Sequence, residues 1–270
     1  MHKYWIMEKY VMTRIDLVAL DVDGVLRDAS ELVYECHRTA LKEVGLDGEF
    51  GKSFTVKELW HFKGLGKFNS KRLSLMAIAV LLKTGNAKDV SDLISRADAE
   101  DHIMDIVDSE PHDDIRGNMN AMVSAYVAKF RSDSSAKLTH VYPGVAAMLS
   151  RFLKGGKRLA IVTNSSLESV KKDLPEGMIK KFEAVITPED VKASKPSGEG
   201  LKLLSSVSGV KPGKIAYVGD TVIDVRAAKD ARCISVSVLS GMGLRQHIEL
   251  EKPDRIFADL KEAGRWILEQ

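Results

Sequence analysis

The chain has 270 residues, of which 44% are hydrophobic and 29% are charged, a balance that excludes a disordered or fibrous protein. Its 40 basic and 38 acidic residues leave a net charge of +2, so charge gives no reason to expect a nucleic acid or a membrane surface as partner. The two cysteines, Cys36 and Cys233, are too few for a disulfide scaffold or a cysteine-rich zinc site. They favour a reducing cytoplasm.

The beginning of the chain does not have the pattern of a signal peptide. Glu8, Lys9 and Arg14 interrupt the apolar stretch that such a peptide needs, and we interpret residues 1–13 as an extension before the fold. The most apolar helical stretch, residues 73–82, is far shorter than the roughly 20 residues that cross a bilayer. The sequence therefore predicts no membrane span.

Five short apolar runs, rich in β-branched residues, predict the strands of a sheet. They span residues 15–20, 158–163, 183–187, 214–219 and 233–239. Most are hydrophobic without alternation, which is typical of strands buried on both faces of a parallel sheet. Helical patterns at residues 144–154, 165–174, 198–208 and 222–231 precede or separate the last four runs. This order predicts an α/β fold with a doubly wound parallel sheet.

The alternation of strand and helix breaks between residues 28 and 140. This segment carries four helical patterns, at residues 31–44, 69–83, 90–107 and 115–131. It is too long to be a loop of a compact domain, so we interpret it as an inserted α-helical domain. The predicted division is a core of residues 14–27 and 141–270, with a cap of residues 28–140 inserted into it.

Polar side chains stand where three of the predicted strands end. They are Asp21 and Asp23 after the first strand, Thr163 and Asn164 at the end of the second, and Asp220 with Asp224 after the strand at 214–219. A lysine, Lys195, lies in a loop after another strand. Because open parallel sheets bind ligands outside the carboxyl ends of their strands, we expect these groups to converge on one crevice.

Four converging carboxylates need compensating positive charge. Lys195 and a bound Mg²⁺ would supply it, since Mg²⁺ prefers carboxylate, phosphate and water oxygens. Each signal also has a plainer interpretation: the Asp21 and Asp23 pair suits a turn, and the four-residue spacing of Asp220 and Asp224 places them on one face at a helix N-terminus. Their occurrence together favours phosphoryl transfer to a carboxylate nucleophile.

These motifs resemble those of the haloacid dehalogenase (HAD) superfamily. The matching segments are DVDGVLRD at 21–28, IVTNS at 161–165, the lysine of KP at 195–196, and GDTVIDVRAA at 219–228. The helical insertion is similar to the cap of the branch that includes phosphoglycolate phosphatase and β-phosphoglucomutase. The resemblance implies a cytoplasmic, Mg²⁺-dependent phosphatase that hydrolyses a small phosphomonoester, such as phosphoglycolate or a sugar phosphate.

The resemblance also implies a role for each motif residue. Asp21 would attack phosphorus and become an aspartyl-phosphate, and Asp23 would protonate the leaving oxygen and then deprotonate water. Thr163, backbone amides near Asn164, and Lys195 would hold the phosphate. The metal would be bound by Asp21, the main-chain carbonyl of Asp23, Asp220 and, directly or indirectly, Asp224.

Two other functions remain as alternatives. A phosphomutase would use the same aspartate pair, but the resemblance then implies a histidine early in the cap, at an offset where this chain has Val33. A non-catalytic binding protein on the same scaffold would most simply have lost one of these carboxylates, which are all present. A dehalogenase has no use for the acid that Asp23 supplies, because it expels halide.

The cap carries no motif that specifies a substrate. A basic segment at 57–72 includes Lys63 and Lys67, which are either part of a solvated loop or face an anionic substrate. We interpret His37 and His61 as packing or surface groups, and the spacing of other cap histidines fits no metal-ligand motif. The sequence specifies neither the substrate nor the oligomeric state.

Overall fold

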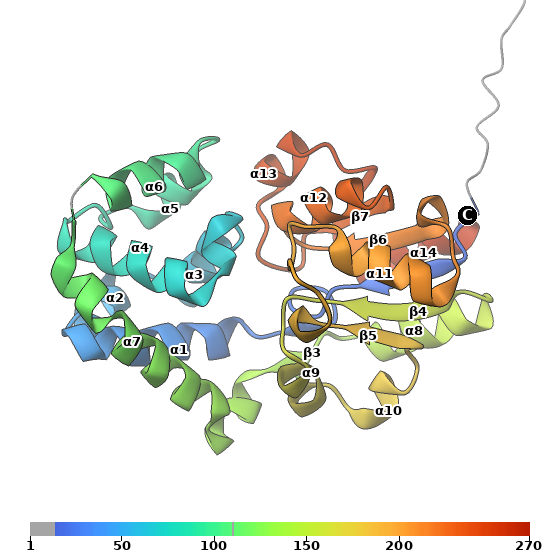
Figure 1. The fold of residues 1–270 in the computed structure, drawn as a ribbon, viewed down its shortest axis with the longest axis horizontal. Helices are drawn as coiled ribbons and strands as arrows, with labels where there is room; N and C mark the ends of the chain where they lie inside the picture. The colour runs from blue at the N-terminus through green and yellow to red at the C-terminus, as the bar shows by residue number, and fades with distance from the viewer. Residues whose placement is uncertain (1–13, 110) are drawn as a thin grey trace, which may run out of the picture.

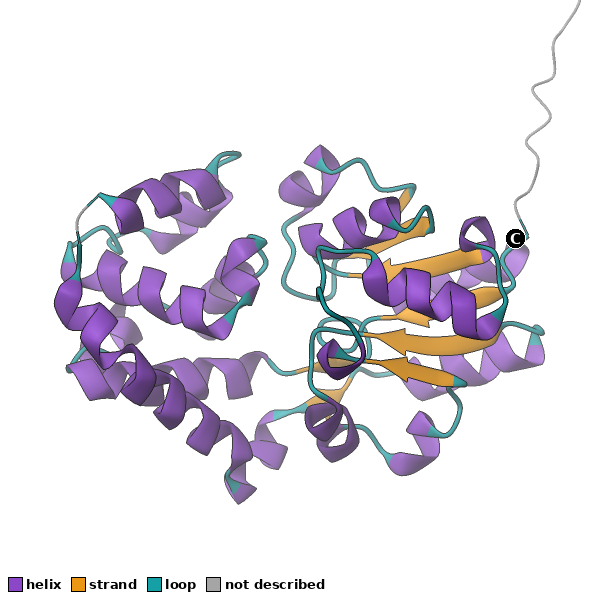
Figure 2. Ribbon diagram, viewed as in Figure 1, coloured by secondary structure: helices purple, strands orange, loops and turns teal. Residues whose placement is uncertain are grey.

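The computed structural model describes residues 14–109 and 111–270, which contain a six-stranded sheet of order β5-β4-β1-β6-β7-β8 (Figure 2). Every neighbouring pair of strands is parallel. The strands are β1 (Leu17–Leu20), β4 (Arg158–Val162), β5 (Ala184–Ile186), β6 (Ile215–Gly219), β7 (Ile234–Val238) and β8 (Arg255–Phe257). The prediction of a doubly wound parallel sheet is confirmed, and the core is Rossmann-like. The predicted N-terminal extension lies outside the described residues.

Helices cover both faces of this sheet (Figure 1). They are α8 (Val145–Lys154), α9 (Leu167–Asp173), α10 (Glu176–Ile179), α11 (Glu199–Ser208), α12 (Val222–Asp230), α13 (Arg245–Leu250) and α14 (Leu260–Glu269). Val18 and Leu20 of β1 pack with apolar residues of α8 and α14, whereas Leu17 and Ala19 pack with those of α11 and α12. Burial on both faces explains why the strand lacks polar alternation.

A second, helical part lies between β2 (Arg27–Asp28) and β3 (His140–Val141), which pair with each other in antiparallel fashion. Its helices are α1 (Ser30–Leu41), α2 (Asp47–Ser53), α3 (Val56–Lys63), α4 (Lys71–Lys83), α5 (Val90–Ser95), α6 (Ala99–Asp108) and α7 (Asp113–Arg131). Most of their buried apolar residues form a cluster separate from the two clusters that flank the sheet, whereas Trp60 of α3 packs with Met242 of the sheet part. In Figure 1 this part lies beyond the carboxyl ends of the strands.

The structure corrects the predicted helix at 90–107. It is broken into α5 and α6, because Arg96 adopts an extended backbone conformation at the end of α5. The Arg96 guanidinium makes two hydrogen bonds to the Asp98 carboxylate, which stabilises the break. The continuous apolar spacing hid this local side-chain interaction.

Several short elements were not predicted. They include α2, α3, α10, α13, the strands β2, β3 and β8, and the last helix α14. The sequence does carry a signal for α3, since Thr55 and Glu58 form a capping box at its start. β8 has only three residues, too few for a period to be read. No helix among the described residues is both long enough and apolar enough to cross a membrane.

The strand order places a crevice at the carboxyl end of β1. β1 lies between β4 and β6, and the chain extends the sheet first through β4 and β5 on one side and then through β6 on the other. The connections therefore diverge at β1, where open α/β sheets bind their ligands. The helical part faces this edge (Figure 1).

Candidate active site

The carboxyl ends of β1 and β6 bring three buried carboxylates together. Asp21 follows β1, Asp220 follows β6, and Asp224 lies in the first turn of α12. Ligand atoms of the three lie within 4.8 Å of one another. The spacing of Asp220 and Asp224 predicted that they share a helix face, but they do not. α12 begins at Val222, and Asp220 lies in the turn before it.

Lys195 is the cation within this cluster. Its Nζ lies 2.8 Å from Asp21 Oδ2 and 2.7 Å from Asp224 Oδ1, and it donates a 2.8 Å hydrogen bond to the Tyr217 hydroxyl. Burial disfavours the charged ammonium, but Asp21 and Asp224 outweigh it and raise the pKa of Lys195 above its usual value. The lysine therefore stays protonated between two carboxylates.

The cluster nevertheless retains unbalanced negative charge. Burial raises the pKa of Asp21 to about 6 against the opposing effect of Lys195, and the charge of Asp224 adds to the rise. Burial and the charges of Asp224 and Asp21 also raise the pKa of Asp220 well above its usual range. One buried oxygen each of Asp21 and Asp220, Oδ1 in both, has no hydrogen-bond partner among the described residues. Unpartnered carboxylate oxygens in a buried cluster of this kind fit a hard divalent cation.

Asp224 is placed differently from the other two carboxylates. Its Oδ2 accepts hydrogen bonds from the backbone amide and the hydroxyl of Thr221, which cap α12. Its Oδ1 accepts from Lys195 and from Tyr217. Both oxygens of Asp224 therefore already accept hydrogen bonds, which ties this carboxylate to Lys195 and to the start of α12.

Two glycines make room for the Asp220 carboxylate. Gly24 has φ +79°, a conformation that favours glycine, and a Cβ there would lie 2.1 Å from Asp220 Oδ2. A Cβ on Gly241 would lie 2.0 Å from the same oxygen. Gly24 is thus needed both for the turn after Asp23 and for the close approach of the Asp220 carboxylate to the backbone there.

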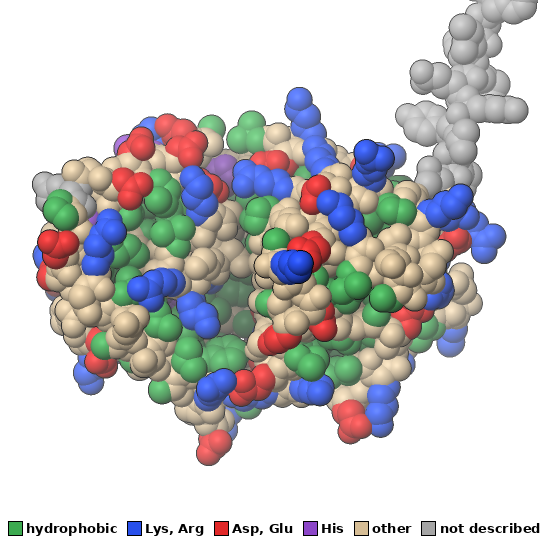
Figure 3. Space-filling model, in the orientation of Figure 1, with side chains coloured by type: hydrophobic (Ala, Val, Ile, Leu, Met, Phe, Trp, Pro, Cys, Tyr) green, Lys and Arg blue, Asp and Glu red, His purple; other side chains and the backbone are tan. Residues whose placement is uncertain are grey.

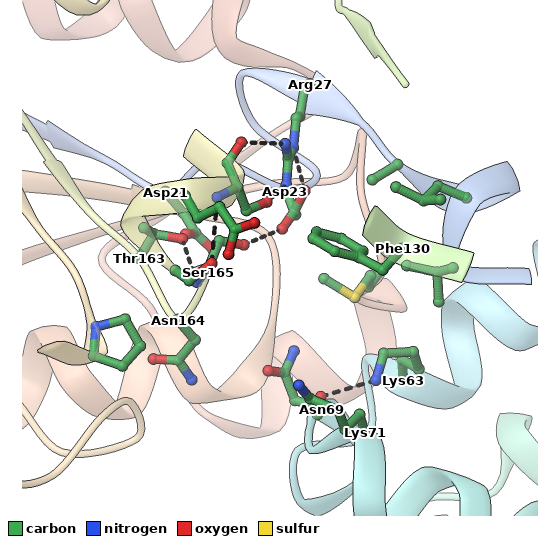
Figure 4. Close-up of a pocket in the computed structure, with 18 of the residues that line it drawn as sticks. Asp21, Asp23, Arg27, Lys63, Asn69, Lys71, Phe130, Thr163, Asn164 and Ser165 are labelled. Carbon is green, nitrogen blue, oxygen red and sulfur yellow. Dashed lines mark hydrogen bonds and ion pairs between the residues drawn. The ribbon is translucent and has the colours of Figure 1, made fainter. Parts of the chain in front are cut away.

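Thr163 and Asn164 follow β4 and line the cavity beside Asp21 (Figure 4). The Thr163 hydroxyl accepts a 3.1 Å hydrogen bond from the Ser165 amide. The Asn164 side chain makes two 3.0 Å hydrogen bonds with the backbone of Lys195, one as donor and one as acceptor. Asn164 therefore positions the loop that carries Lys195, a contact that the sequence did not predict.

Asp23 is held by two donors that the sequence analysis did not identify. The Arg27 Nε donates to Asp23 Oδ1 at 2.6 Å, and the Ser165 hydroxyl donates to Asp23 Oδ2 at 2.6 Å (Figure 4). Burial alone would raise the pKa of Asp23, but Arg27 and Ser165 more than offset it and hold the pKa below its usual value. The four-residue spacing of Asp23 and Arg27 predicts a contact only on a helix, and this segment is a turn that leads into β2, so no local pattern indicated the pair.

A cavity of about 530 Å³ lies between the carboxylate cluster and the helical part. Figure 3 shows the hollow, with apolar side chains in it and Lys and Arg side chains near its edge. Its helical wall includes Leu32, Val33, Trp60, Tyr126 and Phe130. A small organic molecule could therefore contact the carboxylate cluster at one end and an apolar wall at the other.

Lys63 lines this cavity (Figure 4). Lys67 is not among the described residues that line it. The Lys63 Nζ donates hydrogen bonds to the carbonyl oxygens of Phe68 and Asn69, and burial lowers its pKa to about 7. The Lys67 Nζ lies 3.5 Å from a carboxylate oxygen of Glu100, on another side of the turn. Of the two alternatives for the basic segment, these contacts of Lys67 are those of a solvated turn.

Two histidines of the helical part, His37 and His61, have structural contacts. His37 is buried and lies within hydrogen-bond distance of the Ser74 hydroxyl and the Val33 carbonyl. His61 Nδ1 lies 2.9 Å from the Met242 carbonyl in the sheet part. His37 thus packs inside the helical part, and His61 bridges the two parts.

A buried lysine and carboxylate cluster at the end of a doubly wound sheet is the arrangement of an α/β enzyme rather than of a scaffold protein. The model of the family described as haloacid dehalogenase-like hydrolase matches residues 15–232. The chain therefore belongs to the haloacid dehalogenase-like hydrolases.

Known relatives share much of the chain. It is 28% identical to a phosphoglycolate phosphatase of Nitrosococcus oceani, over 92% of this chain and 94% of that protein. It is 34% identical to a phosphoglycolate phosphatase of Salmonella typhi over 48% of this chain and 52% of that one. Among solved structures, a "predicted phosphoglycolate phosphatase" of Haemophilus somnus has a TM-score of 0.65 at 22% identity, covering 94% of this chain and 99% of that one. A structure from Lactobacillus delbrueckii reaches 0.71 at 17% identity, covering 95% and 100%. At these identities the structural likeness concerns the fold.

Proposed function

We propose that this hydrolase is a phosphatase that cleaves a small phosphomonoester through an aspartyl-phosphate on Asp21, with Mg²⁺ as cofactor. The observation that carries the proposal is the position of Asp21, a buried carboxylate that borders the cavity, pairs with Lys195 and has one oxygen without a hydrogen-bond partner. A nucleophilic carboxylate needs such a free oxygen.

In the first step an oxygen of Asp21 forms a bond to phosphorus while the bond from phosphorus to the ester oxygen breaks. Asp23 first takes up a proton, against the effect of Arg27 and Ser165 on its pKa, and gives this proton to the leaving oxygen, so an alcohol departs. In the second step Asp23 accepts a proton from water, and the water oxygen attacks phosphorus. The bond between phosphorus and Asp21 breaks, which releases inorganic phosphate and restores the carboxylate.

Other residues would hold the phosphoryl oxygens during both steps. The Lys195 ammonium and the hydroxyl of Thr163 border the same end of the cavity. Backbone amides near Asn164 are further donors at the start of the segment that leads to α9. Fixed donors of this kind stabilise the charge that develops on a transferring phosphoryl group.

The metal would be held by Asp21, by the main-chain carbonyl of Asp23 and by Asp220, with Asp224 acting through Lys195. When bound, Mg²⁺ would neutralise the carboxylates and the phosphate. The unpartnered Oδ1 of Asp220 supports this assignment, because it can accept a cation without losing a hydrogen bond.

We propose that residues 28–140 act as a cap over a core of residues 14–27 and 141–270. The short β2–β3 pair, which joins the two parts, would serve as the hinge. The names of the relatives suggest phosphoglycolate as substrate, and a sugar phosphate remains an alternative within the same chemistry. The free, buried Cys36 and Cys233 agree with the cytoplasmic setting that we propose.

A phosphomutase of the β-phosphoglucomutase type is the second candidate. Its proton-transferring histidine would have to reach the cavity, but the corresponding position is Val33, and no histidine is among the described residues that line the cavity. His37, one helical turn later, is buried against Ser74 instead. These observations favour hydrolysis over phosphoryl transfer between two hydroxyls of a sugar.

The test is an assay of the purified protein with Mg²⁺. We expect release of phosphate from p-nitrophenyl phosphate, and a panel of phosphorylated metabolites ranked by kcat/KM would identify the substrate. Phosphoglycolate and sugar phosphates belong in the panel, and interconversion of sugar phosphates without phosphate release would favour the mutase instead. Absence of phosphate release from every ester would contradict the proposal.

A further inference from the structure

The Arg27 guanidinium contacts three other residues at the candidate site, and the motif analysis gave Arg27 no role. Its Nε bonds to Asp23, as described above, and its other two nitrogens point to α9. Nη1 forms an ion pair with the Asp173 carboxylate and a 3.3 Å hydrogen bond to the Ser169 carbonyl. Nη2 donates to the Ser169 hydroxyl at 2.9 Å. The planar guanidinium thus connects the Asp23 carboxylate to a helix about 140 residues away in the sequence.

These contacts are shielded from water. The side chain of Arg27 is 2% exposed and that of Asp173 is 1% exposed, whereas that of Asp23 is 21% exposed and reaches the cavity. The Arg27–Asp173 pair is therefore an anchor inside the protein, from which one nitrogen extends to a partly accessible carboxylate. Burying two charges costs desolvation free energy, so a buried pair of this kind needs well-placed partners, which fix the guanidinium in one position.

The position of Arg27 in the chain adds a second connection. Arg27 is the first residue of β2, which pairs with β3 and leads directly into the helical part. Its carbonyl oxygen also accepts a 2.9 Å hydrogen bond from the Gly24 amide, so the turn after Asp23 closes on Arg27 through the backbone as well. Movement of β2 would therefore displace the Asp23 carboxylate.

Both oxygens of Asp23 are engaged by residues of the sheet part and its connection, Arg27 on Oδ1 and Ser165 on Oδ2. With two donors on two different oxygens, the plane of the carboxylate is fixed. Proton transfer to or from a reacting group requires a side chain held within hydrogen-bond reach of it. The residue that fixes Asp23 therefore affects the rate of each step in which Asp23 takes part.

We propose that Arg27 is a positioning residue that, anchored on α9 by Asp173 and Ser169, holds the Asp23 carboxylate in place for proton transfer and couples it to the hinge strand β2. This inference rests on the proposed phosphatase function, because it assigns Arg27 a task in that reaction. Asp23 transfers the proton, and Arg27 touches neither the substrate nor the reacting atoms.

The step most sensitive to Arg27 is hydrolysis of the aspartyl-phosphate. With p-nitrophenyl phosphate the leaving group departs as a stable anion, so formation of the aspartyl-phosphate needs little help from an acid. Attack by water still needs Asp23 as a base. Loss of the anchor should therefore slow the second step selectively and cause the phosphoenzyme to accumulate.

The experiment compares wild-type protein with three variants. Arg27→Met/Asp173→Leu removes both partners of the buried pair, which avoids an unpaired charge that could prevent folding. Arg27→Lys keeps the charge without the fork that joins Asp23 to α9. Arg158→Met is the matched control, since Arg158 forms an ion pair with Glu183 at the opposite end of the sheet. Circular dichroism and thermal melting establish that each variant is folded.

Rapid-quench measurements with p-nitrophenyl phosphate and Mg²⁺ give the two steps separately. For the double variant we expect a burst of about one nitrophenolate per site at nearly the wild-type rate, because that step needs little acid. A steady-state rate about 10- to 100-fold lower should follow, a share of the roughly 10²–10⁴ that a positioned acid or base contributes. Arg27→Lys should show a smaller loss of the same kind, and Arg158→Met should match wild type.

Two results would overturn the role of Arg27: an unchanged steady-state rate in the folded double variant, or equal slowing of the burst and the steady state, which is the sign of a merely structural effect. A wild-type protein that releases no nitrophenolate would contradict the proposed function, and with it this role. The two failures are thus distinguished by the wild-type arm.

Discussion

The side-chain amide of Asn164 and the backbone of Lys195 are joined by two hydrogen bonds of 3.0 Å each. The two residues come from loops after different strands, β4 and β5, and the paired bonds fix one loop against the other. Lys195 in turn bridges Asp21 and Asp224. The position of the ammonium therefore depends on a residue that does not itself contact the carboxylates.

Replacing Asn164 with alanine should lower kcat/KM for p-nitrophenyl phosphate about tenfold, since two hydrogen bonds of roughly 1 kcal/mol each hold the Lys195 loop. Steady-state kinetics test this, and thermal melting should show a lower midpoint. Asn118→Ala is the matched control, because the Asn118 side chain bonds only to its own helix, at the Asp114 carbonyl. Equal activity of the Asn164→Ala variant and wild type would show that the loop is held by other contacts.

Replacing Asp21 with asparagine should abolish turnover and leave the fold intact, because an amide is a poor nucleophile. Circular dichroism checks the fold. Mass spectrometry of wild-type protein quenched with acid during turnover should find phosphate on Asp21. Asp16→Asn is the control, since Asp16 lies before β1 and pairs with Lys214. Phosphate on a serine or histidine would contradict the covalent scheme.

Replacing Asp220 with asparagine should have opposite effects on metal binding and on stability. The Mg²⁺ concentration needed for half-maximal activity should rise, because a charged ligand is lost. In EDTA, however, the variant should melt at a higher temperature than wild type. Burial and the charges of Asp224 and Asp21 raise the pKa of Asp220 well above its usual range, so a charged Asp220 lowers the stability of the metal-free protein, and asparagine removes that cost.

Activity titrations with Mg²⁺ and melting curves in EDTA measure the two effects of Asp220→Asn. Asp230→Asn is the control, because Asp230 pairs with Lys202 on the surface and should leave the Mg²⁺ requirement unchanged. Full activity of the wild-type protein in excess EDTA would contradict the metal site itself.

The motif carboxylates could be predicted because a local rule places them. Each follows a recognisable buried strand, and parallel strands bring their carboxyl ends to one edge of the sheet. The partners of these residues could not be found in that way. Arg27 meets Asp173 over a separation of 146 residues, and Asn164 meets the Lys195 backbone over 31. Such contacts depend on tertiary packing that no local pattern encodes.

The basic segment of the helical part, at residues 57–72, shows the same limit. Lys63 and Lys67 are four residues apart and indistinguishable by type, yet one is buried beside the cavity and the other is half exposed beside Glu100. Their difference arises because α3 ends at Lys63 and the chain turns before Lys67. The turn itself depends on local sequence. Tertiary packing determines which of the two lysines faces the sheet part.

Replacing Lys63 with methionine should impair substrates that carry a second anionic group. For phosphoglycolate we expect kcat/KM to fall by about 10- to 100-fold, because a lost charge-assisted hydrogen bond costs roughly 1.5–3 kcal/mol. For p-nitrophenyl phosphate, which offers no second anion, the effect should be slight. Lys67→Met is the matched control and should behave as wild type on both substrates.

The pH dependence gives a second measurement of Lys63. Because burial lowers its pKa to about 7, its ammonium loses the proton as pH rises through that value. The ratio of kcat/KM for phosphoglycolate to that for p-nitrophenyl phosphate should therefore fall between pH 6 and pH 8 in wild type and stay flat in Lys63→Met. A flat ratio in wild type, or equal losses on both substrates in the variant, would argue for a role in folding alone.

His37 should make the free energy of unfolding depend on pH. Burial and the nearby charge of Lys63 lower the pKa of His37 to about 3, against a value of 6.5 in the unfolded chain. As pH falls below 6.5 the unfolded chain therefore binds a proton that the folded protein does not, and this group lowers stability by about 1.4 kcal/mol per pH unit. His37→Gln keeps polar partners for Ser74 and should show a shallower decline between pH 6.5 and pH 4.5.

Urea unfolding at several pH values measures the slopes. His140→Gln, at a side chain that is 65% exposed, is the control and should keep the wild-type slope. Identical slopes for wild type and His37→Gln would mean that His37 takes up its proton in the folded protein as readily as in the unfolded chain.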